Sequence, residues 1–292
     1  MEAELRSQPE TWARAVELRA EQRLLPASGQ RIAVVGCGTS WFMAQSYAAL
    51  RETAGLGLSD SFAASEAFID RDYDAIVAIS RSGTTTEVLE LLDRLRASGS
   101  RARTIGIVGD PQTPLADGVD DLVRLPFADE QSVVQTRFAT TALAFLRASL
   151  GENLHAAIAD ATIAVDEQLD DTLVSADQYT FLGSNWTVGL AHEAALKMRE
   201  ASQSWTESYP AKEYRHGPIA IAAPGRVTWM LGEAPEGLAG DVAATGAHFE
   251  NASFDGLADL IRVQRIALAR ARRLELDPDH PRNLTRSVIL AS

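Results

Sequence analysis

Residues 75–87 have the sequence AIVAISRSGTTTE, in which a short apolar run meets a turn rich in hydroxyl groups. The run 75–79 is wholly apolar and rich in β-branched side chains, which is typical of a strand buried on both faces of a parallel sheet. Beyond the turn, apolar side chains recur at helical spacing, namely Val88, Leu89, Leu91, Leu92 and Leu95. The stretch therefore predicts a strand, a tight turn and a helix, with Thr84 and Glu87 forming a capping box at the helix start.

The turn has the composition of an anion-binding site. Backbone N–H groups at a helix start lack partners within the helix, and the helix dipole favours negative charge there. Gly83 lets the backbone approach a ligand closely, and Arg81 adds a charged fork. Hydroxyl donors come from Ser80, Ser82, Thr84 and Thr85. We interpret residues 80–85 as a phosphate cradle, although an ordinary capped turn is the alternative, and no Gly-Lys-Ser/Thr follows to make a Walker loop.

A second glycine turn, GCGTS at residues 36–40, lies upstream. It joins an apolar strand predicted at 31–35 to a helix predicted from Trp41 to Leu50. Because it lacks the third glycine and the downstream acidic residue of a dinucleotide fingerprint, we expect another anion-binding or hydroxyl-binding loop. Cys37 in this turn is either a nucleophile or a small buried residue. No local His or Cys partner supports a nucleophile, so we favour burial.

Strands and helices alternate along the first half of the chain. The remaining predicted elements are strands at 59–63, 103–108 and 121–125, helices at 132–150 and 153–174, and a helical lead-in over 3–25 that Pro9 interrupts. This alternation predicts an α/β fold with a parallel, doubly wound sheet that binds ligands at the carboxyl ends of its strands. Both hydroxyl-containing turns fall at that edge.

The pattern restarts in the second half. Residues 178–183 (QYTFLG) mirror residues 31–36, and Gly183 lies 147 residues after Gly36. The segment 194–197 follows the segment 47–50 at the same distance. This indicates an internal duplication. We therefore predict two domains, 1–163 and 164–292.

Composition limits the function classes. The chain has 292 residues, a formal net charge of −13 and 46% hydrophobic residues, which suits one large or two ordinary domains. The acidic balance argues against a nucleic-acid surface, so an anionic ligand needs local donors. The single cysteine excludes an internal disulfide and indicates a reducing compartment. No basic leader and no long apolar stretch occurs, so we expect a cytoplasmic protein that binds neither nucleic acid nor membrane.

The second half of the chain contains candidate catalytic residues. Glu193, Lys197 and Glu200 stand at i, i+4 and i+7, so their side chains share one face of a predicted helix. That face is either a site or a ladder of surface salt bridges. His216 lies between charged residues and a Gly-Pro break. Histidine titrates near neutral pH and serves in general acid–base catalysis, which favours a site.

With these residues in view, the chain resembles the sugar isomerase (SIS) domain family, in the manner of the isomerase half of glucosamine-6-phosphate synthase. The resemblance runs from Glu4 to the C-terminus. The matching segments are LRSQPE (5–10), GCGTS (36–40), ASEAF (64–68), ISRSGTT (79–85), EQSVVQTRFAT (130–140), EAALKMREAS (193–202), ESYPAKEYRHGP (207–218) and PRNLTRSV (281–288). It implies a tandem of two SIS domains, each a three-layer αβα sandwich with a mostly parallel sheet. It also implies a homodimer in which a histidine reaches the neighbouring subunit's site.

The resemblance also implies roles for individual residues. The phosphate ligands it implies are Ser40, Ser80, Ser82 and Thr85, with Arg81 where the synthases have glutamine. The sugar-lining residues it implies are Thr39, Val133 and Gln135, the last replacing a serine of the synthases. Glu200 matches the base that moves a proton between C1 and C2, His216 matches the group that assists ring opening, and Lys197 stands beside them. No metal or cofactor is implied.

Two departures from the synthases shape the predicted function. Their glutamine-hydrolysing domain has no counterpart here, so we expect no glutamine amidotransferase activity. Arg286 replaces a lysine that forms an imine with the keto sugar, and arginine cannot do so at ordinary pH.

We therefore predict a stand-alone phosphosugar enzyme for an amino or N-substituted sugar phosphate, either an isomerase or a deaminase or deglycase. The alternative is a non-catalytic sugar-phosphate sensor. Glu200 and His216 argue against that alternative because binding a phosphate needs neither.

Overall fold

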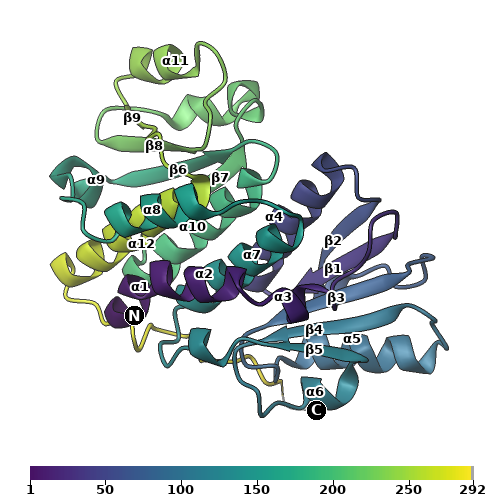
Figure 1. The fold of residues 1–292 in the computed structure, drawn as a ribbon. Helices are drawn as coiled ribbons and strands as arrows, with labels where there is room; N and C mark the ends of the chain where they lie inside the picture. The colour runs from purple at the N-terminus through teal and green to yellow at the C-terminus, as the bar shows by residue number, and fades with distance from the viewer. Residues whose placement is uncertain (291–292) are drawn as a thin grey trace. The chain divides into compact units, whose positions relative to one another are not determined.

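The computed structural model describes residues 1–290, and the chain divides into two compact units (Figure 1). The first unit consists of Glu10–Leu154 together with residues 285–290. The second unit consists of Met1–Pro9 and His155–Leu284. Each unit has its own parallel sheet, so the predicted α/β class is confirmed.

The sheet of the first unit has five parallel strands in the order β2-β1-β3-β4-β5. Their bounds are Ile32–Gly36 (β1), Ser59–Ala63 (β2), Ala75–Ser80 (β3), Arg103–Val108 (β4) and Asp121–Arg124 (β5). These agree with the predicted strands to within a residue at each end. Four of them were marked by apolar or β-branched residues, whereas β2 (SDSFA) is mostly polar and only partly buried. The chain order reverses between β1 and β3, so the turns after these two strands flank a topological switch point.

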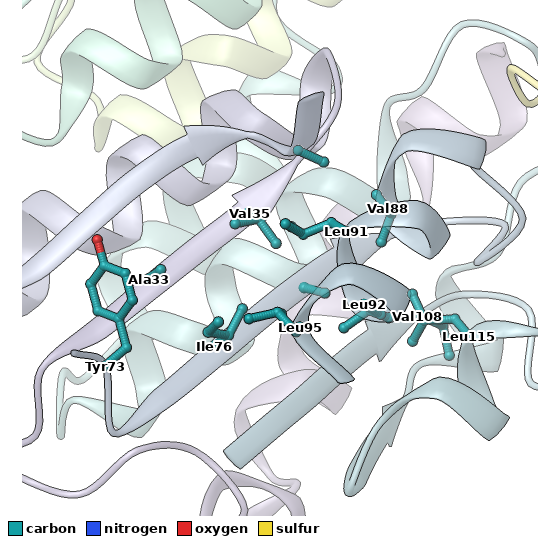
Figure 2. Close-up of a cluster of buried hydrophobic side chains, with 12 residues drawn as sticks. Ala33, Val35, Tyr73, Ile76, Val88, Leu91, Leu92, Leu95, Val108 and Leu115 are labelled. Carbon is teal, nitrogen blue, oxygen red and sulfur yellow. The ribbon is translucent and has the colours of Figure 1, made fainter. Parts of the chain in front are cut away.

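Helices cover both faces of this sheet. On one face, Leu91, Leu92 and Leu95 of α5 (Thr86–Ala97) pack against strand residues such as Val35 and Ile76 (Figure 2). Fully burying one such leucine stabilises the fold by about 1.5–3 kcal/mol. On the other face, α4 (Thr39–Thr53) packs against β1, β2 and α7 (Arg137–Ser149). The unit's remaining elements are most of α2 (Gln8–Val16), α3 (Arg19–Gln22), η1 (Ala64–Glu66), α6 (Leu115–Gly118) and η2 (Pro126–Ala128).

The helix predicted at 132–150 begins at Arg137, five residues later than expected. The reason is the buried carboxylate of Glu130, which accepts the backbone N–H groups of Thr136, Arg137 and Phe138 at 2.7–3.0 Å. Burial raises the pKa of Glu130, although hydrogen bonds from Thr136 act in the opposite direction. Glu130 therefore fixes the helix start, and residues 131–136 form a loop.

The N-terminal lead-in is also divided differently from the prediction. It consists of α1 (Glu2–Arg6), α2 (Gln8–Val16) and α3, and Pro9 is the second residue of α2 rather than a break. Proline is tolerated in the first helical turn because its missing N–H would have no intrahelical partner there.

The sheet of the second unit has four parallel strands in the order β7-β6-β8-β9, which repeats the order β2-β1-β3-β4. The strands are β6 (Gln178–Gly183), β7 (Thr206–Pro210), β8 (Arg226–Leu231) and β9 (His248–Glu250). The helices and turns are α1, α8 (His155–Ala164), α9 (Asp171–Ser175), α10 (Thr187–Ser202), η3 (Glu213–His216), η4 (Pro218–Ile221), α11 (Leu238–Ala244) and α12 (Gly256–Arg273). The helix predicted at 153–174 is thus two helices, α8 and α9.

The equivalent glycines of the two units meet equivalent neighbours. A Cβ on Gly36 would lie 2.7 Å from the backbone carbon of Ser40, and one on Gly183 would lie 2.2 Å from the carbonyl oxygen of Thr187. Ser40 and Thr187 are separated by the same 147 residues as the two glycines. In both units the first strand therefore ends where the next helix approaches it too closely for any side chain.

The two units differ from the predicted domains 1–163 and 164–292. Helix α8 belongs to the second unit, so the division falls at residue 155. The chain also changes unit near both ends, since residues 1–9 belong to the second unit and residues 285–290 belong to the first. Local sequence patterns do not reveal such exchanges. Among residues 1–290, no helix has the length and apolarity that a membrane span requires.

Candidate functional site

The predicted phosphate cradle forms the link between β3 and α5. Ser80 ends the strand, and its Oγ accepts the backbone N–H of Gly83 at 3.0 Å. Gly83 has φ +60°, and a Cβ there would lie 1.9 Å from Thr113 Oγ1. Only glycine fits this turn, since both its backbone conformation and its closeness to Thr113 exclude a side chain.

The predicted capping box is wrong. The N-cap residue of α5 is Thr85 rather than Thr84, and in the part of the chain described here it makes no side-chain cap. Thr85 Oγ1 instead lies 3.5 Å from Ser80 Oγ, and Glu87 Oε2 is buried without a hydrogen-bond partner among these residues. The start of α5 thus lacks the side-chain acceptor that helices normally place there, which leaves it suited to an anion.

The hydroxyl groups of the cradle are close together and largely buried. Ser80 and Ser82 are both buried, and Ser82 Oγ accepts the Thr84 hydroxyl at 3.0 Å. Ser82 and Thr84 also contact Ser287 near the C-terminus. The structure therefore brings Ser80, Ser82 and Thr85 together in one turn, as predicted.

The Arg81 side chain binds backbone carbonyl groups of two other segments. Its side chain is 2% exposed; Nη1 donates to the carbonyl of Ser132 at 2.8 Å, and Nη2 donates to the carbonyl of Arg286. These contacts fasten the loop 129–136 and the C-terminal segment to the cradle. Arg81 thus shapes the surroundings of the turn through two carbonyl groups.

Arg286, at the position of the synthases' imine-forming lysine, is itself paired. Its Nη2 lies 2.7 and 2.9 Å from the two carboxylate oxygens of Asp129, and its Nε donates to the carbonyl of Glu130. Both contacts come from the single Nη2 atom, so they form one charge-assisted hydrogen bond shared between the two carboxylate oxygens. Arg286 therefore anchors the C-terminal segment.

The predicted sugar-lining residues lie on two segments of the first unit. Thr39 and Ser40 are buried at the start of α4, beside the end of β1. Val133 and Gln135 lie in the loop that Glu130 and Arg81 hold, and both are partly exposed. Gln135 Oε1 is buried and has no hydrogen-bond partner within residues 1–290.

Cys37 lies between β1 and α4 and is partly buried. Burial, with a smaller effect from the charge of Glu87, raises the pKa of its thiol from 9.0 to about 11. A thiol needs a low pKa to act as a nucleophile near neutral pH. The arrangement favours the interpretation of Cys37 as a structural residue.

We expect Cys37 to react with iodoacetamide at pH 7.5 about 100-fold more slowly than in the urea-unfolded chain, because a thiol pKa of about 11 instead of 9.0 leaves about a hundredth of the thiolate. The alkylation rate should rise about tenfold per pH unit up to pH 10. Mass spectrometry of the single cysteine measures both rates. Equal rates in the folded and unfolded chain would contradict the structural role.

The carboxylates and lysine predicted to share a face lie on α10 in the second unit. Lys197 is fully buried; its Nζ lies 3.5 Å from Glu193 Oε1 and donates to Glu200 Oε2. Glu193 is buried as well, whereas Glu200 is partly exposed. The three residues are therefore brought together, with Glu193 and Lys197 buried, rather than as the surface ladder that was the alternative.

His216 ends η3 and is exposed. Its imidazole makes no hydrogen bond or ion pair with other residues in the described range, so nothing there joins it to Glu200 or Lys197. A different histidine, His192 on α10, is partly buried with Nδ1 2.9 Å from Ser208 Oγ. Burial, with a smaller effect of the Arg199 charge, lowers the pKa of His192.

Sequence reasoning gave no role to Asp129, Glu130 or Ser287, although two of the matching segments contain Glu130 and Ser287. The sequence did offer a signal for Ser287, since this hydroxyl residue directly follows Arg286 in the matching segment 281–288. No group of His, Cys, Asp and Glu side chains within residues 1–290 is arranged to hold a metal ion.

Comparison with known proteins finds both a family match and similar longer chains. Residues 26–150, which lie within the first unit, match the SIS domain family model. The isomerizing glutamine–fructose-6-phosphate aminotransferase of Nostoc sp. (strain PCC 9229) is 26% identical, over 95% of this chain and 54% of the relative. The enzyme of the same name from Sulfurisphaera tokodaii is 28% identical, over 89% of this chain and 50% of the relative. The chain thus spans about half the length of these relatives.

Two solved structures share the fold. Glucosamine-6-phosphate deaminase from Thermotoga maritima superposes with a TM-score of 0.83 and 25% identity, covering 99% of both chains. Tagatose-6-phosphate ketose/aldose isomerase from Escherichia coli has a TM-score of 0.79 and 18% identity, covering 99% of this chain and 95% of the other. The resemblance to the SIS domain family is confirmed, and the relatives are phosphosugar isomerases, aminotransferases and deaminases.

Proposed function

We propose that this chain, whose residues 26–150 match the SIS domain family, is an enzyme that binds an amino or N-substituted sugar phosphate and transfers a proton between its C1 and C2 carbons. The observation that carries this proposal is the cradle's cluster of hydroxyl groups, with Ser80 and Ser82 buried, at the start of α5, where residues 1–290 provide no N-cap side chain. Hydroxyl donors, backbone N–H groups and a helix dipole together favour a phosphate group. The second unit, with its repeated strand order, is proposed as a second SIS domain.

Candidate acid–base residues lie on α10. They are Glu193, Lys197 and Glu200, which we call the α10 group. A buried lysine between two glutamates is not explained by stability, because the cost of desolvating buried charges offsets most of their attraction. An aldose–ketose shift through an enediol needs one base that accepts a proton from one carbon and returns it to the next. We assign that role to Glu200, with Lys197 holding its carboxylate.

The proposed reaction is an isomerisation, or the release of an amine in the manner of a deaminase. The likeness to glucosamine-6-phosphate deaminase supports amine release. Arg286 cannot form an imine, and its ion pair with Asp129 instead anchors the C-terminal segment. Assay of glucosamine 6-phosphate, galactosamine 6-phosphate and fructosamine 6-phosphates for amine release and for ketose formation separates the two reactions. The absence of either product with every one of these substrates would contradict the proposal.

A sugar-phosphate sensor is the second candidate. It is favoured by the ion pairs that engage the proposed base, since Lys197 contacts both Glu193 and Glu200. A sensor would bind the same ligands in the cradle and convert none of them.

Ser82→Ala and Thr85→Ala should each weaken the binding of glucosamine 6-phosphate by about 1–3 kcal/mol, the usual loss when a hydrogen bond to a charged group is removed. Calorimetry measures the change. Ser98→Ala is the matched control, because Ser98 lies at the other end of α5 and, within residues 1–290, its hydroxyl bonds only to the carbonyl of Leu95. Native affinity in both cradle variants would remove the phosphate assignment.

A further inference from the structure

The last described residues of the chain, Thr285–Leu290, lie on the phosphate cradle, and we call them the tail. They belong to the first unit, as does the cradle. Ser287 Oγ lies 3.1 Å from Ser82 Oγ and 2.8 Å from Thr84 Oγ1. One tail hydroxyl thus engages two hydroxyl groups of the cradle at once.

The tail backbone also reaches the helix start. The carbonyl of Val288 accepts the backbone N–H of Thr86, the first residue of α5, at 3.3 Å. The backbone N–H of Leu290 donates to Thr86 Oγ1 at 2.9 Å. A carbonyl oxygen carries partial negative charge, so Val288 occupies the helix N-terminus in the way that an anion would.

Arg286 fastens the tail to the body of the unit. Its guanidinium pairs with both oxygens of Asp129, and its own carbonyl accepts the side chain of Arg81. The segment after the arginine is less well covered: Val288, Ile289 and Leu290 are 49%, 71% and 56% exposed. The tail is therefore held by the ion pair of Arg286 and by the backbone hydrogen bonds of Val288 and Leu290, while its last three side chains bury little surface.

We propose that the tail is a removable plug of the cradle, in which Ser287 and Val288 take the hydroxyl and N–H donors that a phosphate group needs, and the Arg286–Asp129 ion pair is the latch. This inference rests on the proposed function, because it assumes that the cradle binds phosphate. Tail docking and phosphate binding then compete for Ser82, Thr84 and Thr86. The phosphate affinity then depends in part on the fraction of molecules in which the tail is undocked from the cradle.

Competition of this kind predicts the direction in which the phosphate dissociation constant changes when the tail is loosened. When only a fraction of molecules has a free cradle, the apparent dissociation constant is the intrinsic one divided by that fraction. A change that weakens tail docking without touching the cradle therefore tightens phosphate binding. If the tail instead completed the binding site, the same change would weaken binding.

Asp129→Asn tests the latch, because it removes the charge while keeping the shape of the side chain. We expect it to lower the dissociation constant of inorganic phosphate, measured by calorimetry on the full chain, by about fivefold, since a partly exposed ion pair contributes modestly. The matched control is Asp121→Asn. Asp121 pairs with Arg103 on the same sheet, and the exposed fractions of that pair, 25% and 40%, resemble the 23% and 34% of Asp129 and Arg286. The control should bind phosphate with native affinity.

Tail release can be followed directly. Ile289→Cys places a thiol on the exposed part of the tail, and a maleimide dye labels it selectively because Cys37 has a raised pKa. Adding phosphate should lower the fluorescence anisotropy of the dye as the tail leaves the cradle. The same label in the Asp129→Asn chain should show low anisotropy before any phosphate is added.

The outcomes separate this inference from the proposed function. Tighter phosphate binding by Asp129→Asn together with falling anisotropy supports the plug. Native phosphate binding that Asp129→Asn leaves unchanged or weakens, or an anisotropy that stays constant as phosphate binds, overturns the plug and leaves the proposed function standing. If neither the native chain nor Asp129→Asn binds phosphate or glucosamine 6-phosphate, the proposed function fails, and the plug fails with it.

Discussion

Glu200→Gln should lower turnover of the sugar phosphate by about 10²-fold or more, while substrate affinity stays close to native. Glutamine keeps the shape and hydrogen-bonding capacity of the side chain but cannot accept the proton that leaves C1 or C2. The contact with Lys197 loses its charge, yet the lysine keeps Glu193 as a partner at 3.5 Å. The substitution should therefore slow the chemical step and leave substrate binding nearly unchanged.

Isotope exchange gives the sharper measurement. During turnover in deuterated water, the native protein should place deuterium at C1 or C2 of the sugar, and Glu200→Gln should do so far more slowly. Glu193→Gln is the matched control, because it removes the other carboxylate beside Lys197 without removing the proposed base. Thermal unfolding of both variants measures what the ion pairs contribute to stability.

Two results would contradict the assignment of Glu200. Near-native turnover and exchange in Glu200→Gln would make the α10 group a structural ion-pair cluster, and the base would then be sought at His216 first. An equal loss of activity in Glu193→Gln and Glu200→Gln, with equal loss of stability, would show that both act by supporting the fold.

Mixing His216→Ala chains with Glu200→Gln chains should restore activity that each variant lacks alone. The resemblance to the SIS family implies a homodimer in which a histidine completes the neighbouring site, and His216 is exposed on η3. In a mixed dimer one of the two sites then receives both native residues. Random exchange of equal amounts should give about a quarter of the native activity.

The experiment requires proof that subunits exchange. Differently tagged chains captured together after mixing provide it, and analytical ultracentrifugation gives the oligomeric state. Each variant mixed with itself is the control and should stay inactive. Verified exchange without any recovered activity would place His216 and Glu200 in the same chain's site, or remove His216 from the reaction.

Much of the fold could be predicted because its causes are local. The strands β1, β3, β4, β5 and β6 follow runs rich in apolar, aromatic or β-branched residues, which favour a buried strand, whereas β2 (SDSFA) does not. The cradle between β3 and α5 was also predictable, since Gly83 and its neighbouring hydroxyl groups lie within a few residues of one another. The spacing of Glu193, Lys197 and Glu200 likewise placed them on one helix face.

The remaining features depend on contacts between residues that are distant in sequence. Arg81 was expected to bind phosphate, but it turns to the carbonyl of Arg286, which lies about 200 residues away. Thr84 and Glu87 had the spacing of a capping box, yet a tail residue meets the helix start instead. A charged or hydroxyl side chain can satisfy several partners equally well, so its choice depends on which groups the folded chain brings near it. For the same reason the exchange of chain ends between the two units is set by packing, which no local sequence pattern records.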